Sequence, residues 1–330
     1  MKNTPISLSR RQLLTGSIAT GLALGVSSIM GCAAGKKSVT HSLKPFSKAP
    51  GFYPFTVGDI TGTVLSDGIV RLPLEAVVTN ANPEEVKAIL QEYFLPTEQV
   101  NAALNTAVLS VGGKNILIDT GYGDEGLAFN GYQEAQLIAA GLAPEQINTV
   151  FITHAHPDHM SGLIKADGTP LYPNAELVIH ENEYNFWNGS ARGIAPLAGV
   201  VSGFNSNIVP LKNSLRTVKG GDEIAPGVSV FNAPGHTPGH SCVMLSSGNE
   251  QLLLTADLAN HHLLFLKNPD YHFSFDFEPE SAAKTRRAVL QQISAERLRI
   301  LAFHFPFPGI GYVRADGASS YQFIPEVWGA

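Results

Sequence analysis

The sequence predicts an α/β protein made of two halves, each with strands first, then helices and further strands. Three observations support this fold class. Short apolar runs typical of buried strands recur along the chain, and segments with helical spacing of apolar residues lie between them. Histidine or aspartate follows four of the apolar runs, at loop positions where a rigid scaffold presents reactive groups. The 330 residues, of which 44% are hydrophobic and 15% charged, suffice for one large globular domain.

The N-terminus is predicted to be an export signal covering residues 1–32. Ser9–Leu14 resembles a twin-arginine motif. The apolar stretch Gly16–Met30 is too short and too glycine-rich to favour a membrane-spanning helix. The residues before Cys32 resemble a bacterial lipobox, except that Met30 is not typical of its position. We therefore expect an exported, periplasmic protein, either lipid-anchored to a membrane through Cys32 or cleaved nearby. An uncleaved signal anchor is the alternative.

Residues 33–51 are predicted to be a polar tether, and residues 52–330 a single folded domain. Cys242 lies in an apolar run and is the only cysteine besides Cys32, so no disulfide framework supports the fold, and we expect Cys242 in the core. The formal net charge is −6 and no basic patch is present, which excludes nucleic acid as a partner. Membrane contact is expected only through the export signal or a lipid on Cys32.

Local signals place the elements of the domain. Asn82 followed by Pro83 predicts a capped helix, and Asp67-Gly68 predicts the turn of a hairpin within residues 55–72. Residues 189–209 are rich in Gly, Ser and Asn and are expected to form a mobile lid over the site. The other expected elements are a hairpin across Gly112-Gly113, strands at 149–152, 177–180, 228–231, 252–257 and 298–301, and helices at 132–140, 181–188 and 280–293.

The densest chemical signal is the run from His154 to His159, which follows the apolar run Thr149–Ile152. It places three imidazoles and one carboxylate at H-x-H-x-D-H spacing, and these are the ligand types that zinc prefers. A solvated histidine-rich loop is the alternative. Further ligand-type residues follow three later apolar runs, and they are His236 and His240, Asp257, and His304. The sequence therefore predicts a metal centre at one edge of the sheets.

These motifs resemble the metallo-β-lactamase superfamily over residues 52–330. Phe303–Gly311 is similar to the branch that holds methyl parathion hydrolase and related lactonase-like enzymes. The resemblance implies an αββα sandwich, in which two mixed β-sheets face each other and helices flank both. It also implies two divalent metal ions, zinc by default, in a binuclear centre. By residue-by-residue match, one ion would be held by His154, His156 and His236, the other by Asp158, His159 and His304, with Asp257 bridging.

The function implied by this resemblance is a metal-dependent hydrolase that uses a metal-bridging hydroxide on esters, lactones or phosphotriesters. Asp158 and Asp257 are the expected catalytic carboxylates, with Asp158 also steering the hydroxide or moving a proton. Zinc β-lactamases carry cysteine at the position of Asp257 or lack the bridging carboxylate, so antibiotic hydrolysis is disfavoured. The alternative is a glyoxalase-type thioester hydrolase, although a basic C-terminal cluster for glutathione is missing. The superfamily's diiron oxygen reductases usually have glutamate in place of the second histidine and carry a flavin module, so His156 disfavours that function. A non-catalytic member typically loses ligands, so the complete ligand set disfavours that alternative.

Other residues are predicted to support the centre or the substrate. His240 is expected to support the strand or a ligand, and Asp67 and Asp119 either orient ligand imidazoles or cap turns. His261 and His262 are expected to form a solvent-exposed pair, and the alternative is that one of them lines the pocket. An apolar pocket for the acyl or aryl group of a small neutral substrate is expected from four aromatic residues, for which ordinary core packing is the alternative. These residues are Phe129, Phe186, Trp187 and Phe204. A homodimer is left open.

Overall fold

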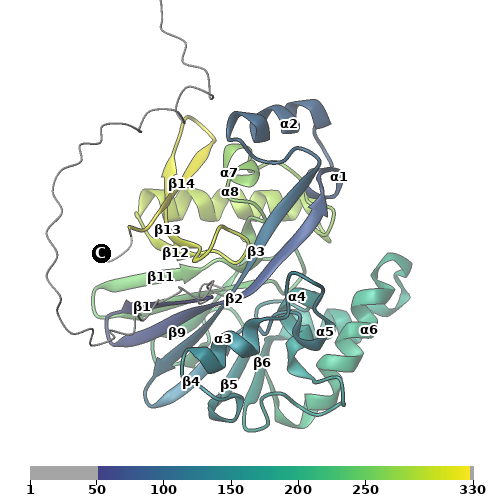
Figure 1. Ribbon diagram of the computed structural model, residues 1–330, viewed down its shortest axis with the longest axis vertical. Helices are drawn as coiled ribbons and strands as arrows, with labels where there is room; N and C mark the ends of the chain where they lie inside the picture. Colours follow the sequence, from purple (N-terminus) through teal and green to yellow (C-terminus); the bar gives the residue numbers. More distant parts are fainter. Residues whose placement is uncertain (1–50, 328–330) are drawn as a thin grey trace, which may run out of the picture. The chain divides into compact units, whose positions relative to one another are not determined.

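The computed structural model describes residues 51–327, which form two seven-stranded β-sheets with helices on their outer faces (Figure 1). The strand order is β1-β2-β3-β4-β5-β6-β7 in the first sheet and β14-β13-β12-β11-β10-β9-β8 in the second. Both sheets are mixed, because β4 to β7 are parallel neighbours in the first and β11 and β12 are parallel in the second. The predicted αββα sandwich is confirmed.

The strands of the first sheet are β1 (Phe52–Val57), β2 (Ile60–Pro73), β3 (Gln99–Val111), β4 (Lys114–Ile118), β5 (Thr149–Ile152), β6 (Glu176–His180) and β7 (Leu215–Val218). Those of the second are β8 (Glu223–Ala225), β9 (Val228–Asn232), β10 (Ser241–Ser247), β11 (Glu250–Leu254), β12 (Arg299–Leu301), β13 (Ile310–Ala315) and β14 (Tyr321–Pro325). The α-helices are α1 (Leu74–Val77), α2 (Pro83–Glu92), α3 (Gln133–Ala139), α4 (Pro157–Met160), α5 (Glu181–Asn188), α6 (Ala198–Asn207), α7 (Leu264–Lys267) and α8 (Pro279–Ala295).

Within residues 51–327, three apolar clusters hold the layers together, as burial of one face of each sheet requires. The cluster between the sheets joins strands of both, with Val64 and Leu109 from the first and Val243 and Leu252 from the second. A second cluster packs α2, α7 and α8 on the second sheet, and a third packs α3, α5 and α6 on the first. In Figure 1, α8 lies beside β12 and β13, whereas α3 and α5 lie beside strands of the first sheet. Cys242 is fully buried, as expected.

The predicted signal (1–32), including Cys32, and residues 33–50 of the predicted tether lie outside the described residues. Between Gly51 and Val327, none of the helices has both the length and the apolar character to cross a membrane. Most of the predicted elements are present at their expected places. The Asn82 side chain, for example, accepts a hydrogen bond from the backbone N–H of Glu84 at 3.0 Å and caps α2.

The predicted turn at Asp67-Gly68 is wrong. Strand β2 continues through these residues with a register shift between Ser66 and Gly68, and the chain reverses earlier, at Gly58-Asp59. Gly68 has a φ of +110°, which glycine tolerates well, and this conformation fits a bulge as well as a turn. A bulge re-aims a side chain, and here it directs the Asp67 carboxylate inward, where it accepts hydrogen bonds from backbone N–H groups.

Residues 189–209 are not a loop of coil. They form two 3₁₀ turns, at Ser190–Gly193 and Ala195–Leu197, followed by α6. Phe204 on α6 is fully buried, and its ring lies 5.8 Å from that of Tyr184 on α5. The high content of Gly, Ser and Asn predicts a loop, because these residues have weak helix propensity. The helix forms nevertheless, because burial of the large apolar Phe204 side chain outweighs this local preference.

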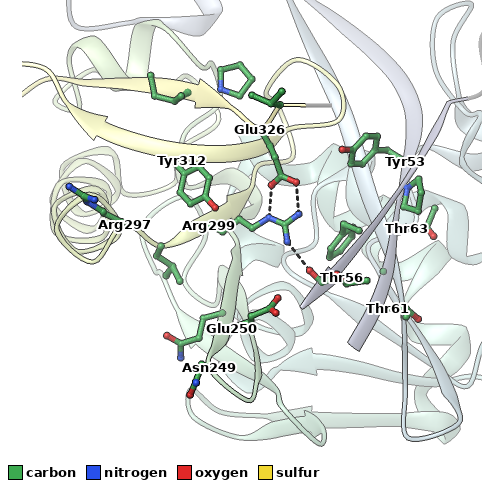
Figure 2. A pocket seen from close by; sticks show the side chains of 18 of the residues that line it. Tyr53, Thr56, Thr61, Thr63, Asn249, Glu250, Arg297, Arg299, Tyr312 and Glu326 are labelled. Atoms are coloured by element: carbon green, nitrogen blue, oxygen red, sulfur yellow. Dashed lines mark hydrogen bonds and ion pairs between the residues drawn. The ribbon is translucent and has the colours of Figure 1, made fainter. Parts of the chain in front are cut away.

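A cavity of about 1110 Å³ lies along β1 and β14, the edge strands of the two sheets. Figure 2 shows Arg299 of β12 between them. Its guanidinium donates to both carboxylate oxygens of Glu326, at 2.6 and 2.8 Å, and to the backbone oxygen of Thr56 at 2.7 Å. None of the predicted metal ligands lines this cavity, so its position does not mark the chemical site.

The predicted ligands follow the carboxyl ends of strands in both sheets. His154 lies two residues after the end of β5 in the first sheet, and Asp158 and His159 lie on the short helix α4. In the second sheet, β9, β11 and β12 run in the same direction, so their carboxyl ends share one edge. His236, Asp257 and His304 follow these three strands. The sandwich therefore brings residues that are far apart in sequence to one place.

Candidate metal centre

Three imidazole nitrogens converge on one point. His154 Nε2 lies 3.1 Å from His156 Nδ1 and 3.2 Å from His236 Nε2, and the last two nitrogens are 3.0 Å apart. Two nitrogens bound to one tetrahedral zinc ion would lie about 3.3 Å apart, given zinc–nitrogen bonds of about 2.0–2.1 Å. The three observed separations are close to this value, so the spacing fits a shared cation. We call these residues the first donor set.

A second donor set consists of Asp158, His159 and His304. Asp158 Oδ2 lies 3.5 Å from His159 Nε2 and 3.6 Å from His304 Nε2. His159 is fully buried, and its Nε2 makes no well-aligned hydrogen bond, although the carboxylates of Asp257 and Asp158 lie 3.1 and 3.5 Å away. A metal ion among these atoms would satisfy the nitrogen and both carboxylates. The residues therefore fit a divalent ion here as well.

Asp257 lies between the two donor sets. Its Oδ2 is 3.3 Å from His236 Nε2 in the first set and 3.1 Å from His304 Nε2 in the second. Its Oδ1 is 3.1 Å from His159 Nε2 and has no hydrogen-bond partner. A carboxylate that faces both sets in this way can bridge two cations. Asn260 donates to Oδ2 at 2.9 Å, which fixes the orientation of the carboxylate.

Buried carboxylates orient one imidazole in each set. His236 Nδ1 lies 2.8 Å from Asp276 Oδ1, and His159 Nδ1 lies 2.9 Å from Asp119 Oδ2. In each ring, a proton on Nδ1 leaves Nε2 free for a metal ion. Asp119 also accepts two hydrogen bonds from Thr153 and has a φ of +61°, a strained conformation for a non-glycine residue. Of the two roles predicted for Asp119, its contacts match the orientation of an imidazole.

Asp67 has different contacts from Asp119. Its carboxylate accepts hydrogen bonds from the backbone N–H groups of Tyr122 and Gln133, both at 2.9 Å, and so ties loops together. Burial raises the pKa of Asp67 to about 6, although these hydrogen bonds oppose that effect. Gly121 is required beside it, because a Cβ at that residue would lie 2.4 Å from the Asp67 carboxyl carbon. These contacts match neither predicted role of Asp67, because its donors lie far away in the chain, residues 67–68 form a bulge and no imidazole of the described residues is in contact with it.

His240 supports the centre through the backbone. Its Nδ1 lies 2.7 Å from the carbonyl oxygen of Ala233, and its Nε2 accepts a hydrogen bond from the N–H of Asp257 at 3.0 Å. His240 thus holds the backbone of Asp257 without joining a donor set. His304 is oriented similarly, with Nδ1 3.0 Å from the carbonyl oxygen of Ala103. Nε2 of His304 is thereby left to face Asp257.

Burial and charge divide the imidazoles into two electrostatic classes. Burial lowers the pKa of His154 and His156 well below the usual histidine range, so both are neutral and keep a lone pair for a metal ion. Burial also opposes a charge on His159, but the carboxylates of Asp158, Asp257 and Asp119 outweigh it and raise its pKa. A proton and a metal ion would therefore compete for this imidazole.

The predicted pocket aromatics lie in different surroundings. Trp187 and Phe204 are buried in the cluster that packs the first sheet, although the Trp187 ring also lies 6.1 Å from that of His156. Phe186 is buried against Phe277 at 4.6 Å between ring centres. Phe129 is 44% exposed, with the Arg71 guanidinium 3.7 Å from its ring centre. A role of these four residues in substrate binding stays a prediction.

Two features near the centre differ from or extend the sequence analysis. The expectation of an exposed His261-His262 pair is wrong, because His261 is buried and its Nδ1 accepts from the N–H groups of Leu263 and Leu264. Phe273 was not predicted, yet its ring stacks on that of His236 with 6.1 Å between centres. Neither contact has a spacing pattern in the sequence that would reveal it.

Comparison with known proteins places the chain in a family. Residues 101–304 match the Metallo-beta-lactamase superfamily, and the chain belongs to that superfamily. The solved structure of AidC, a dizinc quorum-quenching lactonase in complex with a product, is 28% identical with a TM-score of 0.80 and covers 84% of this chain and 98% of its own. The hydrolase AbOPH of the beta lactamase superfamily is 30% identical with a TM-score of 0.80 and covers 86% of this chain and 100% of its own.

Curated relatives are N-acyl homoserine lactonases. The enzyme AiiA of Bacillus thuringiensis subsp. kurstaki is 25% identical over 213 residues, which are 57% of this chain and 76% of that protein. A Bacillus sp. lactonase is 28% identical over 163 residues, but the match spans only 58% of its length and 43% of this chain. The predicted resemblance to the lactonase-like branch is confirmed. Fold, donor sets and hydrolase relatives together support a metal-dependent hydrolase that binds divalent metal.

Proposed function

We propose that the protein is a binuclear metal-dependent hydrolase that opens neutral lactones and cleaves aryl esters, with phosphotriesters as weaker substrates. The observation on which this proposal rests is the pair of donor sets that share Asp257. Two divalent ions, with zinc expected, would supply a hydroxide at neutral pH and polarise the carbonyl or phosphoryl oxygen of the substrate. The dizinc lactonase AidC, with a TM-score of 0.80, supports this choice of metal and reaction.

The chain's own carboxylates would handle charge and protons in this reaction. Asp257 faces both donor sets, with Oδ1 near His159 of the second set and Oδ2 near His236 of the first. Asp158 is partly exposed, at 14% of its side chain, and lies 3.5 Å from His159 Nε2. It can accept the proton released by water and return it to the leaving oxygen as the acyl C–O bond breaks. Opening of a lactone in this way consumes one water and yields a hydroxy acid.

Aromatic rings beside the ligands favour a neutral substrate with an apolar part. The ring centres of Trp187 and Phe273 lie 6.1 Å from those of His156 and His236, and the Phe303 ring stacks on that of His159 at 4.0 Å. Apolar walls around a few convergent polar groups are typical of small-molecule sites. The chain has a net charge of −6, which disfavours polyanionic substrates such as nucleic acids. N-acyl homoserine lactones, the substrates named for its relatives, have this neutral and apolar character.

Metal content and substrate choice test the proposal together. Elemental analysis of untagged protein should give two divalent ions per chain, and a value near zero or one in active protein would contradict the binuclear centre. We expect kcat/KM to be highest for an acyl-homoserine lactone or an aryl ester and lower for a dialkyl aryl phosphotriester. A clear preference for a β-lactam or a glutathione thioester, measured beside them, would overturn the substrate assignment.

A further inference from the structure

Glu183 on helix α5 is fully buried between the two loops that supply the first donor set. Its Oε1 accepts hydrogen bonds from the N–H of Ala155 at 2.8 Å and from Trp187 Nε1 at 2.7 Å. Its Oε2 accepts from the Thr237 hydroxyl at 2.7 Å and from the N–H of Gly239 at 3.0 Å. One oxygen therefore holds the loop of His154 and His156, and the other holds the loop of His236.

The packing around Glu183 leaves little freedom for these loops. A Cβ added at Gly239 would lie 2.2 Å from the backbone nitrogen of Glu183, so the second loop is pressed directly onto α5. The two loops also meet through the N–H of Ser241, which donates to the carbonyl oxygen of Thr153 at 3.1 Å. Trp187 lies one helical turn after Glu183, where its hydrogen bond fixes the carboxylate rotamer.

We propose that Glu183 is a positioning residue that sets the spacing of the first donor set and thereby its affinity for metal. The inference rests on the proposed metal-dependent function. His154 and His156 flank Ala155, and His236 lies three residues before Gly239, so both anchored N–H groups are close to ligands in sequence. A buried carboxylate held by four neutral donors also brings a negative charge behind the site, which favours a bound cation.

The second donor set is held by other contacts. The carbonyl oxygen of His159 accepts from the N–H and the hydroxyl of Thr120, at 2.8 and 2.9 Å, and its ring is oriented by Asp119. His304 is oriented by Ala103. Loss of the Glu183 carboxylate should therefore weaken the first donor set while the second keeps its geometry. This selectivity separates a positioning role from general destabilisation.

Glu183→Gln keeps the shape of the side chain but replaces one acceptor oxygen with a donor. The new NH₂ group fits best on the side of Thr237, because a hydroxyl can accept as well as donate. The N–H of Gly239 then faces a donor, and the loop of His236 must move. On the other side, the amide oxygen still accepts from Ala155 and Trp187. The substitution should thus separate His236 from His154 and His156.

The experiment titrates metal-free protein with Co²⁺ against a competing chelator and follows the visible absorption bands, which report coordination geometry. The binding phase of the first donor set is identified as the one that disappears in His236→Ala. In Glu183→Gln we expect the affinity of that phase to fall by about 10–100-fold, as for other residues that orient metal ligands, and the other phase to change less than about twofold. Thr237→Val should shift the same phase by a smaller factor.

Glu181→Gln is the matched control on the same helix, because Glu181 is partly exposed and pairs with Lys219 at 3.5 Å. It should leave both phases unchanged. Wild-type affinity and spectra in Glu183→Gln, or an equal loss in both phases, would overturn the positioning role. If wild-type protein bound no cobalt at all, the proposed function itself would fail, and this outcome is distinct from the previous two.

Discussion

The two ligand-bearing loops of this protein build their parts of the centre in different ways. The loop from His154 to His159, which follows β5 after Thr153, supplies four of the seven ligand-type residues from six consecutive positions. The loop from Pro234 to His240 supplies only His236 to a donor set. Its second histidine, His240, acts indirectly, because its Nε2 accepts a hydrogen bond from the N–H of Asp257 at 3.0 Å.

The orientation of the ligands differs between the loops as well. In the first loop, Asp119 holds both His159 and Thr153, so one carboxylate fixes the ring and the backbone. In the second, Asp276 holds His236 and is itself 3.5 Å from Arg286, a buried guanidinium that also donates to the carbonyl oxygens of Leu258, Pro269 and Tyr271. A compact ligand motif is thus supported locally, whereas an isolated ligand depends on a wider network.

Asp257→Ala should have the largest effect, because Asp257 serves both donor sets. Its removal separates the two sets and takes away the carboxylate next to three imidazoles. Changes in groups that only orient ligands cost about 10–100-fold, so we expect kcat/KM to fall by at least about 100-fold. Elemental analysis should show fewer than two ions per chain. Full occupancy with near-normal turnover would contradict a bridging role.

A smaller but sharper test compares the two histidines of the second loop. His236→Ala removes a member of the first donor set, and we expect at least about a 100-fold loss of metal affinity. His240→Ala leaves all donors in place but deprives the buried N–H of Asp257 of its acceptor, which costs about 1–3 kcal/mol. We expect about a 10-fold loss of affinity in that variant. The opposite ranking, in parallel metal titrations, would mean that the donor set is wrongly assigned.

The contrast between the loops also explains how far the sequence could be interpreted. The ligand-type residues follow strands, and their residue types and spacing are visible without a structure, as at His154, Asp257 and His304. Local signals also located the helix capped by Asn82 and the helix predicted at 132–140. Of the groups that support the ligands, Asp119 and His240 were predicted, whereas Asp276 and Glu183 were not. Asp276 lies in coil and Glu183 inside a helix, and neither has a spacing that marks its role.

The two wrong predictions of local structure have a common physical cause. Asp67-Gly68 has the composition of a turn but forms a bulge, because the Asp67 carboxylate finds backbone donors in a distant loop. Residues 189–209 have the composition of a loop but form helices, because Phe204 is buried. In both cases a tertiary contact outweighed a local preference. Such contacts join residues far apart in the chain, so no window of sequence contains them.

The finest comparison replaces the two orienting carboxylates, one for each loop. Asp119→Asn and Asp276→Asn should each lower metal affinity by about 10–100-fold, but in different donor sets, because Asp119 holds His159 and Asp276 holds His236. Cobalt titrations that resolve two binding phases would show which phase each variant weakens.

Stability should distinguish the same two variants. Asp276→Asn also removes the negative charge beside the buried Arg286, so the free energy of unfolding of the metal-free protein should fall by about 1–3 kcal/mol. The partners of Asp119 include the neutral Thr153, whose hydroxyl can reorient toward an amide, and the expected loss for Asp119→Asn is smaller. Denaturant unfolding in the presence of chelator measures both values. Equal losses of unfolding free energy in the two variants would show that Arg286 and its partners add no support to His236 beyond that of the Asp276 carboxylate.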